Sequence, residues 1–510
     1  MRLTLALTAL LFLASCIVHR LDVVPLPLEN TEPIRVETPV KAHLRNGSTI
    51  VYADGMEVRN GVIYGSGMRY DLGLASATAV SEVPMDDVAA MESYQTPVSK
   101  SATTAATAAS GTGILIGSLL AAVALFGSCP TVYALNNNAQ LPDAELFSYS
   151  IAPSFQSRDV DTLGLAMATD GVVSLSIRNE MLETHYIDQV QLLEVSHSPT
   201  ATVVADQYGR AIIANELAAP VSATDQSGRN LLSAVARNDG AASKATQQRL
   251  NSIAADNLRD HIDLEFDVEP GTDDVALYLR LRNSLLNTVL FYDVMLAEQG
   301  FGALDWLGRD VNQLLNTLNV GLWYRANMGL EILVWDGEAY QSAGHLADQG
   351  PIAWSERAIL LPAVGDSKTL RVRLSYVADN WRIDQVALAS GAQLVESRQV
   401  NVARANAEDG ALPDVPAFLA AADEQYLITR PGESISVYFD VGQADAGMAR
   451  TYLLASSGYY IEWMRPEWLR AEAAAAFVAN DDALLRAIRL YAERRDGYRE
   501  LFETNRVMMQ

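Results

Sequence analysis

Short runs in which apolar and polar residues alternate, separated by turn residues, cover most of this chain. VKAHL and TIVY flank Asn46-Gly47, and MEVR and VIYG flank Asn60-Gly61. An Asn-Gly pair between two alternating runs is a strong short-range signal for a β-hairpin. We therefore predict a small antiparallel β-barrel or meander over residues 39–95.

The region from residue 130 to about 460 is also strand-like, and one pattern recurs within it. LSIRNEMLETHYIDQVQL at 175–192 is echoed by LRLRNSLLNTVLFYDVML at 279–296 and by LRVRLSYVADNWRIDQVAL at 370–388. The first and third copies share Ile-Asp-Gln-Val-x-Leu. Alternation on both sides of a short connection predicts paired strands with one buried face.

This recurrence predicts a mainly β protein with tandem β-sandwich units of the jelly-roll or galactose-binding-like type. Ile-Asp-x-Val-x-Leu at the end of a sandwich resembles the last strand of galactose-binding-like carbohydrate modules. The first two copies are each expected to enter a strand with an aspartate, Asp188 or Asp293. We place a first unit, with a helical insertion, at 129–300 and a second at 301–462.

Helical periodicity interrupts the strands. Apolar residues recur at three-to-four spacing in 243–262 and in 303–318. The C-terminal tail at 463–510 is expected to be α-helical, and Asn480 or Asp481 is expected to cap its last helix.

The first residues, MRLTLALTALLFLASC, have the parts of a secretory signal peptide over 1–16: a positive start, an uncharged apolar run and small residues. LASC at 13–16 resembles the bacterial lipobox, where the signal is cut before a cysteine whose sulfur carries a diacylglycerol. We therefore expect lipidation of Cys16 and a proline-containing tether at 17–38; the alternative is an ordinary secreted protein. Ile17, in place of aspartate, favours the outer membrane over the inner membrane.

A second uncharged apolar stretch, GILIGSLLAAVALFGSC, follows a Ser/Thr/Ala-rich linker at 96–112. Its apolar core is shorter than the ~20 residues of a spanning helix, and the first positive charge after it is Arg158, too distant for the positive-inside rule. We favour an apolar helix at 113–128 that is buried, lies on a membrane, or packs with its own copies through Gly113 and Gly117. A membrane span is the alternative.

The charge balance excludes one class of partner. The chain has 37 Lys and Arg against 62 Asp and Glu, a net charge of −25. Nucleic-acid binders depend on basic groups that neutralise phosphates, so we expect no nucleic-acid partner. Two cysteines also exclude a disulfide-dense scaffold.

Sequence motifs for catalysis are lacking. The histidines include no pair at the spacing of a zinc-protease helix, and there is no Gly-x-Ser-x-Gly elbow. Cys129 lies between an apolar run and Pro130, so we expect an unreactive buried or membrane-proximal thiol. We assign no catalytic residue, metal site or cofactor, and favour a non-enzyme.

All seven tryptophans lie after residue 305. Exposed tryptophans would stack on sugar rings or lie at a membrane interface, whereas buried ones would fill a sandwich core, the interpretation we favour for most of them. Trp381, Trp463 and Trp468 form our candidate ligand surface.

Four motifs resemble those of an uncharacterised family of bacterial envelope lipoproteins. They are FGSCPTVY (126–133), FSYSIAPSFQSRDVDTLGLA (147–166), IRNEMLETHYIDQVQLLEV (177–195) and GYYIEWMRPEWL (458–469). The resemblance spans roughly residues 40–470 and implies an envelope setting and architecture, but no reaction and no catalytic residue. Family members often have Asp-Gly after Cys-Pro, where this chain has Asn136-Asn137-Asn138.

These observations predict a lipid-anchored protein of the bacterial envelope that binds a protein or glycan partner through its β-sandwiches. The alternatives are a carbohydrate-active enzyme or sugar-binding module, and a self-assembling structural subunit. The sequence leaves the oligomeric state open.

Overall fold

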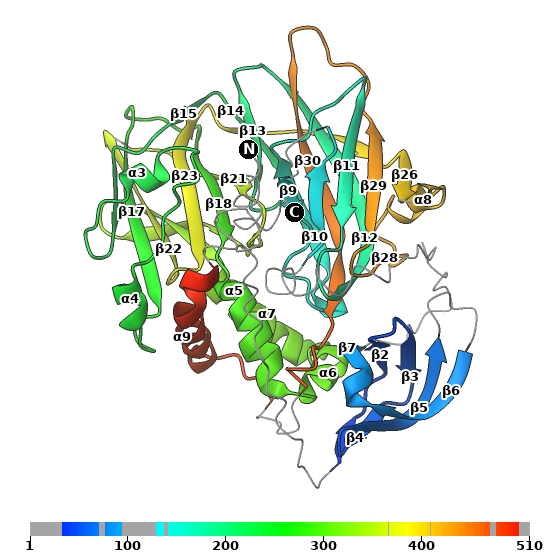
Figure 1. Cartoon of the computed structure of the whole chain (residues 1–510). Helices are drawn as coiled ribbons and strands as arrows, with labels where there is room; N and C mark the ends of the chain where they lie inside the picture. Colours follow the sequence, from blue (N-terminus) through cyan, green and yellow to red (C-terminus); the bar gives the residue numbers. More distant parts are fainter. Residues whose placement is uncertain are drawn as a thin grey trace, which may run out of the picture.

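A computed structural model describes residues 33–70, 77–93, 129–136, 141–365, 367–407, 410–469 and 476–498. In this part of the chain the protein is mainly β, as the alternating pattern predicts, with five sheets of largely antiparallel strands. A small N-terminal sheet, two β-sandwiches and a layer of helices make up the molecule (Figure 1).

The predicted hairpins of the N-terminal region form a seven-stranded antiparallel sheet, in the order β1-β4-β5-β3-β2-β7 with β6 on β5. In β2 the alternation is direct, because Val40, Ala42 and Leu44 are buried and the residues between them are half-buried. The sheet begins at Ile34, within the expected tether. The strands are β1 (Ile34–Val36), β2 (Val40–Leu44), β3 (Thr49–Tyr52), β4 (Met56–Arg59), β5 (Val62–Tyr70), β6 (Ala77–Pro84) and β7 (Val88–Ser93).

The first sandwich packs the sheet β27-β26-β29-β11-β8-β9 against the sheet β10-β30-β12-β25, in which β28 also pairs with β12. Leu175, Leu192 and Val437 point into its core from both sheets. The strands are β8 (Thr131–Ala134), β9 (Pro142–Glu145), β10 (Ser157–Leu163), β11 (Val172–Arg178), β12 (Glu183–His197), β25 (Arg398–Asn401), β26 (Arg404–Ala407), β27 (Gly410–Ala411), β28 (Leu427–Thr429), β29 (Ser434–Asp440) and β30 (Ala449–Glu462).

The second sandwich packs the sheet β15-β23-β18-β21-β13-β14-β24 against β16-β17-β22-β19-β20. Leu279, Val372 and Trp381 lie in its core. The strands are β13 (Thr202–Asp206), β14 (Ala211–Ala214), β15 (Glu216–Ala218), β16 (Ser222–Asp225), β17 (Arg259–Asp267), β18 (Val275–Asn283), β19 (Leu330–Trp335), β20 (Tyr340–Leu346), β21 (Ser355–Leu360), β22 (Thr369–Val377), β23 (Trp381–Ser390) and β24 (Gln393–Val395).

The two sandwiches are nested in the chain, not consecutive. Strands β10 and β11 pair with β30 and β29 from the far end of the sequence, and the whole second sandwich lies between them (Figure 1). The expected units 129–300 and 301–462 are therefore wrong as boundaries, because each sandwich pairs strands from both sides of residue 300.

The repeat behaves differently in its three copies. The first and third copies are the strand pairs β11–β12 and β22–β23, and in each pair the chain crosses from one sheet of a sandwich to the other. In the second copy β18 is followed by helix, and Asp293 lies in the π-helical segment that follows. The prediction that Asp293 lies in a strand is therefore wrong. A fully buried apolar run has no period that separates helix from strand.

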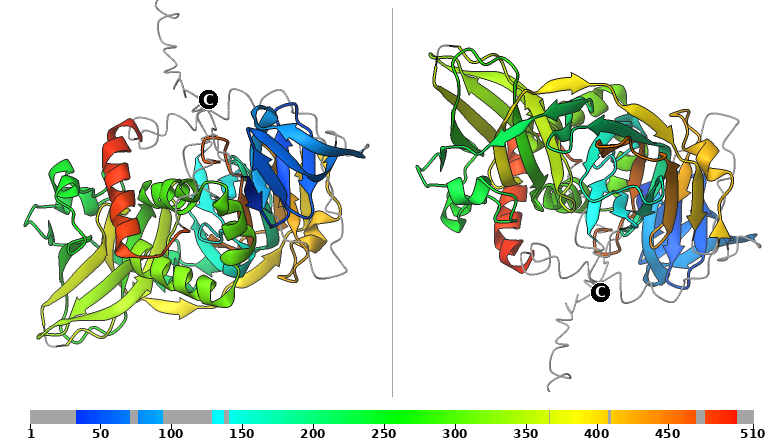
Figure 2. Two further views of the ribbon diagram at one scale, coloured as in Figure 1. Left: turned by 90° about the horizontal axis from the view of Figure 1, so that it is seen from below. Right: turned by 90° about the horizontal axis from the view of Figure 1, so that it is seen from above.

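The helical layer lies beneath both sandwiches (Figure 1), and Figure 2 shows the N-terminal sheet and α9 at its opposite ends. Its elements are α5 (Leu286–Val289), the π-helical segments η3 (Leu290–Leu296) and η5 (Trp306–Asp310), the 3-10 turn η4 (Ala297–Gln299), α6 (Gly302–Asp305), α7 (Leu314–Met328) and α9 (Asp481–Tyr498). Short helices elsewhere are η1 (Met85–Asp87), η2 (Pro153–Phe155), α3 (Leu232–Val235), α4 (Gln247–Asn251) and α8 (Val415–Phe418).

Two helical expectations need correction. The helix expected over 243–262 is reduced to α4, because Arg259 already begins β17. In the tail, residues 463–469 form turns, but α9 follows as expected, and the Asn480 side chain accepts a hydrogen bond from the Ala483 amide at 2.9 Å.

The N-terminal sheet is docked on the rest of the molecule through buried polar contacts. Glu92, 1% exposed, accepts hydrogen bonds from Lys41 Nζ at 2.6 Å and from Thr184 Oγ1 of β12 at 2.5 Å. The His43 ring stacks on Trp463 with 3.7 Å between ring centroids. Burial alone would raise the pKa of Glu92, but the charges and hydrogen bonds of Lys41 and His43 together outweigh burial and hold this pKa well below its usual range.

Among the described residues, no helix combines the length and apolar character that a membrane crossing requires. The apolar segment expected at 113–128 lies outside these residues.

Candidate functional site

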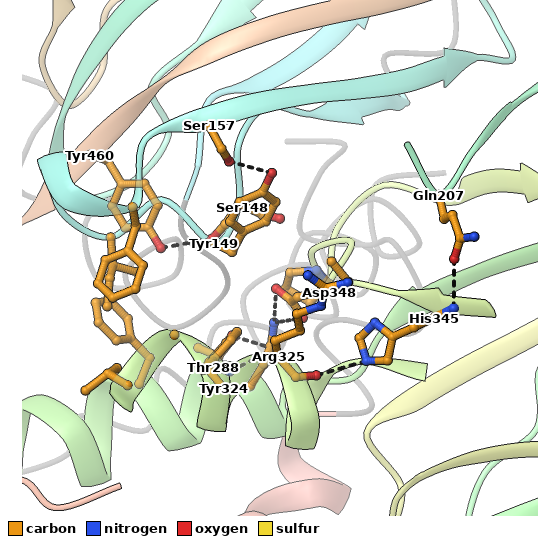
Figure 3. Close-up of a pocket in the computed structure, with 18 of the residues that line it drawn as sticks. Ser148, Tyr149, Ser157, Gln207, Thr288, Tyr324, Arg325, His345, Asp348 and Tyr460 are labelled. Carbon is orange, nitrogen blue, oxygen red and sulfur yellow. Dashed lines mark hydrogen bonds between the residues drawn. The ribbon is translucent and has the colours of Figure 1, made fainter. Parts of the chain in front are cut away.

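A cavity of about 410 Å³ lies where both sandwiches meet the helical layer (Figure 3). The loop before β10, helices α5 and α7, and strand β20 with the loop after it all contribute side chains to its wall. Its size and its mixture of apolar wall and few polar groups are typical of small-molecule sites. The lining residues are Ser148, Tyr149, Ile151, Phe155, Ser157, Gln207, Tyr208, Asn287, Thr288, Phe291, Val320, Gly321, Tyr324, Arg325, His345, Ala347, Asp348, Pro351 and Tyr460.

One side of the cavity is aromatic. Figure 3 shows Tyr149 and Tyr460 facing the side that carries Asp348, Arg325 and His345. The Tyr149 hydroxyl accepts a hydrogen bond from Ser157 Oγ at 2.8 Å, and the Tyr460 hydroxyl donates to the Ser148 carbonyl at 3.1 Å. These bonds fix both rings: Tyr149 is half-buried and offers its apolar face to a ligand, whereas Tyr460 is 1% exposed and packs mainly within the wall.

Asp348 is the carboxyl group of the cavity. Its side chain accepts hydrogen bonds from Asn287 Nδ2 at 3.2 and 3.4 Å, and it is only 5% exposed. Burial raises the pKa of Asp348 to about 7, the Asn287 bond opposes this rise, and the charge of Glu145 adds to it. Asp348 therefore exchanges its proton near neutral pH.

His345 presents a free acceptor. Its Nε2–H donates to the Arg325 carbonyl at 3.1 Å, since a carbonyl oxygen can only accept. Burial lowers the pKa of His345, and the charge of Arg325 lowers it further, so the ring is neutral. In this tautomer Nδ1 carries a lone pair, and that atom is buried without a hydrogen-bond partner in the protein.

The loop from Ala347 to Ala353 that carries Asp348 is held from behind by Glu145. One oxygen of Glu145 accepts hydrogen bonds from the amides of Ile352 and Ala353, at 2.6 and 2.7 Å. Gly350 makes the approach possible, because a Cβ there would lie 2.7 Å from the Glu145 carboxyl, and its φ of +79° favours glycine. Burial raises the pKa of Glu145 to about 7.

Three of the four motifs that carry the family resemblance meet behind this loop, and the fourth, 147–166, lines the cavity. The Cys129 thiol donates to Glu145 at 3.1 Å, and its backbone amide donates to Glu183 at 2.7 Å. Glu183 also contacts His185 at 2.6 Å, and burial raises the pKa of Glu183 to about 8. Glu462 lies beside Glu183, and burial raises its pKa well above its usual value. This buried cluster supports the cavity wall without lining it.

Cys129 itself is 1% exposed and has no disulfide partner among the described residues. Burial raises the pKa of its thiol, and the charge of Glu145 raises it further. A thiol in this state is a poor nucleophile, in agreement with the expected unreactive, buried cysteine.

The expected tryptophan surface is wrong. Trp381 is fully buried in the core of the second sandwich, and Trp468 is 8% exposed and packs on Tyr292. Trp463 is half-buried beneath His43. The large apolar area of each ring is used in packing, so the three do not form an exposed ligand surface.

Three further predicted residues, Cys16, Gly113 and Gly117, lie outside the described residues. No group of three metal-ligating side chains occurs in the part of the chain that the structure describes. The cavity residues Arg325, His345 and Asp348 carried no recognisable motif, and Asn287 lies in the second copy of the repeat but was not singled out. These residues come from segments whose association only the fold determines.

Comparisons with known proteins add little to this picture. No protein family model matches the chain, and no curated protein matches it. Among solved structures, a GH31 alpha-xylosidase from Xanthomonas citri is similar at 10% sequence identity and a TM-score of 0.15, covering 84% of this chain and 38% of that one. A likeness this slight carries no argument about fold or function.

Proposed function

We propose that this chain is a lipid-anchored protein of the bacterial envelope that binds a small glycan-like ligand between its two sandwiches. The observation that carries the proposal is the cavity, where a fixed aromatic side faces Asp348 and His345 and Asn287 is hydrogen-bonded to Asp348. Hydroxyl-rich ligands suit such a site, because their hydroxyls satisfy the polar groups and their ring faces lie on aromatic side chains.

Binding is favoured over hydrolysis by the carboxyl groups of the cavity. Glycoside hydrolysis uses a pair of carboxyl groups on either side of the bond that breaks. Among the lining residues Asp348 is the single carboxyl, and Glu145 is turned away toward backbone amides.

The envelope setting rests on residues 1–16, whose pattern predicts a signal peptide and lipidation of Cys16. Two or three acyl chains would hold the protein stably at a membrane, and the outer membrane is our preferred location. Mass spectrometry of the mature N-terminus tests this part. A diacylglyceryl-modified Cys16 is expected, and an unmodified peptide that starts elsewhere would refute it.

Blocking the cavity mouth tests the binding site. Ala347 is exposed and lines the cavity, so Ala347→Trp should fill the entrance without disturbing the core. Calorimetric titration with a panel of mono- and disaccharides should show binding to the wild type and its loss in Ala347→Trp. The control is Ala417→Trp, an exposed position on α8. Equal binding to both variants would exclude the cavity as the site.

A carbohydrate-active enzyme is the second candidate, favoured by the buried carboxyl of Asp348 in the cavity wall. Burial raises its pKa to about 7, which suits a general acid or base. Release of reducing sugar from an envelope polysaccharide by the wild type, and its loss in Asp348→Asn, would support that function. Binding without turnover would support the first.

A further inference from the structure

Resting on the proposed binding function, we infer that the cavity selects an acidic sugar, a hydroxylated carboxylate of the uronic-acid type, and that Arg325 binds its carboxylate. Three features support this inference: the charge left unpaired at the cavity, the position of that charge on α7, and the acceptor that His345 leaves free.

Arg325 is the unpaired cation of this site. Its side chain lines the cavity and is exposed, so it lies at the mouth. Among the described residues its guanidinium makes no hydrogen bond and no ion pair. The chain has 62 acidic and 37 basic residues, and in the part that the structure describes most arginines pair with a carboxylate, as Arg373 does with Asp263 at 2.6 Å. A guanidinium left unpaired at a cavity is ready to bind a planar anion with two hydrogen bonds.

A backbone contact places Arg325 beside His345. The Arg325 carbonyl accepts a hydrogen bond from His345 Nε2 at 3.1 Å, as well as the bond from the Gly329 amide, at 3.2 Å, that closes α7. The bond from His345 ties the last turn of α7 to β20, so Arg325 and His345 face the same space (Figure 3). A ligand whose carboxylate pairs with Arg325 brings its neighbouring hydroxyl groups toward His345.

The free Nδ1 of His345 requires a donor. It is buried without a partner, and an unmet buried acceptor costs free energy that a ligand O–H recovers when the ring turns Nδ1 toward the cavity. A sugar hydroxyl supplies this donor, whereas a simple alkyl carboxylate does not. The charge favours a carboxylate over a phosphate, because a single arginine balances one negative charge and Asp348 lies in the same cavity.

The aromatic side of the cavity suits the ring of a sugar acid. Tyr149, Tyr324 and Tyr460 line the cavity with Phe155 and Phe291, and a pyranose ring has apolar C–H faces that pack on such surfaces. An anion without a ring would leave this area without a contact.

The test compares sugars that differ only in the acid group. Calorimetry on the purified full chain would measure glucuronate against glucose, and galacturonate against galactose. We expect the acids to bind at least about tenfold more tightly than the neutral sugars. Arg325→Gln should abolish that preference, Arg325→Lys should retain part of it, and the control Arg489→Gln, an exposed arginine on α9, should leave it unchanged.

His345→Phe removes the acceptor and keeps an aromatic ring, so it should weaken both members of each pair by about tenfold and leave the acid preference intact. Equal affinity for acid and neutral sugars, an acid preference that survives Arg325→Gln, or no uronate binding at millimolar concentration would overturn the inference. A different ligand that binds the wild type and not Ala347→Trp would overturn it while the proposed function stands. If no ligand class binds, both fail.

Discussion

Asp188 and Asp384 occupy equivalent β-bulges in the two sandwiches. The register of β12 against β30 skips Asp188, and that of β23 against β18 skips Asp384. Each side chain turns inward and is at most 1% exposed. Asp188 accepts hydrogen bonds from the backbone amides of Asp423 and Glu424, at 3.0 and 2.9 Å. The bulge re-aims one side chain so that a loop can be fastened to the sandwich.

Asp384 fastens the loop at Gly240 in the same way, because it accepts a hydrogen bond from the Gly240 amide at 2.7 Å. It also forms an ion pair with Arg280. The shared Ile-Asp-Gln-Val-x-Leu sequence is therefore the signature of a bulge that anchors a loop.

The two bulge aspartates should differ in their contribution to stability. Asp384→Ala leaves the half-buried Arg280 without this carboxylate, so we expect a loss of about 3–5 kcal/mol. Asp188→Ala removes an acceptor from two amides and from Gln156, for which we expect about 1.5–3 kcal/mol. Urea unfolding followed by circular dichroism measures both, with Asp188→Asn as the variant that keeps one acceptor. A larger loss for Asp188→Ala than for Asp384→Ala would contradict this ranking.

Removal of the Glu145 carboxyl should loosen the cavity wall. In Glu145→Ala the amides of Ile352 and Ala353 and the Cys129 thiol lose their acceptor. We expect faster hydrogen exchange at Ile352 and Ala353 and a stability loss of about 2–4 kcal/mol.

Glu145→Gln keeps one carbonyl oxygen and should show a smaller effect on both measurements. Unchanged exchange in Glu145→Ala would mean that other contacts hold the loop.

The buried acids make stability depend on pH. The pKa of Glu183 is about 8 in the folded protein against an unfolded value of 4.5, and that of Glu145 is about 7. At pH values between 4.5 and their folded-state pKa values, Glu183 and Glu145 are protonated in the folded protein and ionised in the unfolded chain. The free energy of unfolding therefore falls as pH rises toward 8. From pH 6.5 to 8, Glu183 alone should cost on the order of 2 kcal/mol.

Below about pH 6.5 buried histidines oppose the stabilisation that the buried acids give at low pH. Burial lowers the pKa of His185 to about 3, while an unfolded histidine gains a proton near pH 6.5. Thermal unfolding at pH 6.5 and 8 tests the sign, and the isosteric Glu183→Gln should flatten the difference. A wild-type melting temperature that rises between pH 6.5 and pH 8 would contradict the assignment.

Docking of the N-terminal sheet depends on Asp305 at the end of α6. Its Oδ1 accepts hydrogen bonds from the Thr38 amide and the Thr38 hydroxyl, both at 2.9 Å, and from the Glu37 amide at 3.1 Å. Asp305→Ala should speed hydrogen exchange at Glu37 and Thr38 by about tenfold while the sandwiches keep their protection. Asp310→Ala is the matched control, since Asp310 pairs with Arg309 of the same segment. Equal exchange in both variants would place the docking energy elsewhere.

Local sequence pattern was sufficient where one face of a strand is buried. The N-terminal hairpins, the strands around the Ile-Asp-Gln-Val-x-Leu copies and the capped helix α9 all have a clear period or a cap. The nested order of the sandwiches could not be predicted from the sequence. The pairing of β10 with β30 joins residues about 300 positions apart, and an alternating pattern does not indicate which strand a given strand pairs with.

The residues of the cavity were even harder to predict from the sequence. Aromatic content drew attention to Trp381, Trp463 and Trp468, but each is used in packing. Arg325 and His345 are ordinary residues in their own segments, and they matter because α7 and β20 meet. The motif residues Cys129, Glu183 and Glu462 lie behind the cavity wall. Other motif residues, Tyr149, Phe155 and Tyr460 among them, line the cavity, so the most distinctive sequence marks its aromatic side and its support but not its charged side.

The most direct measurement is a crystal structure of the full chain with the tightest-binding sugar from the calorimetric panel. We expect the sugar to lie between Tyr149 and Tyr460 on one side and His345 on the other, with its carboxylate within hydrogen-bond distance of Arg325. A sugar bound elsewhere on the surface, with only water in the cavity, would contradict it.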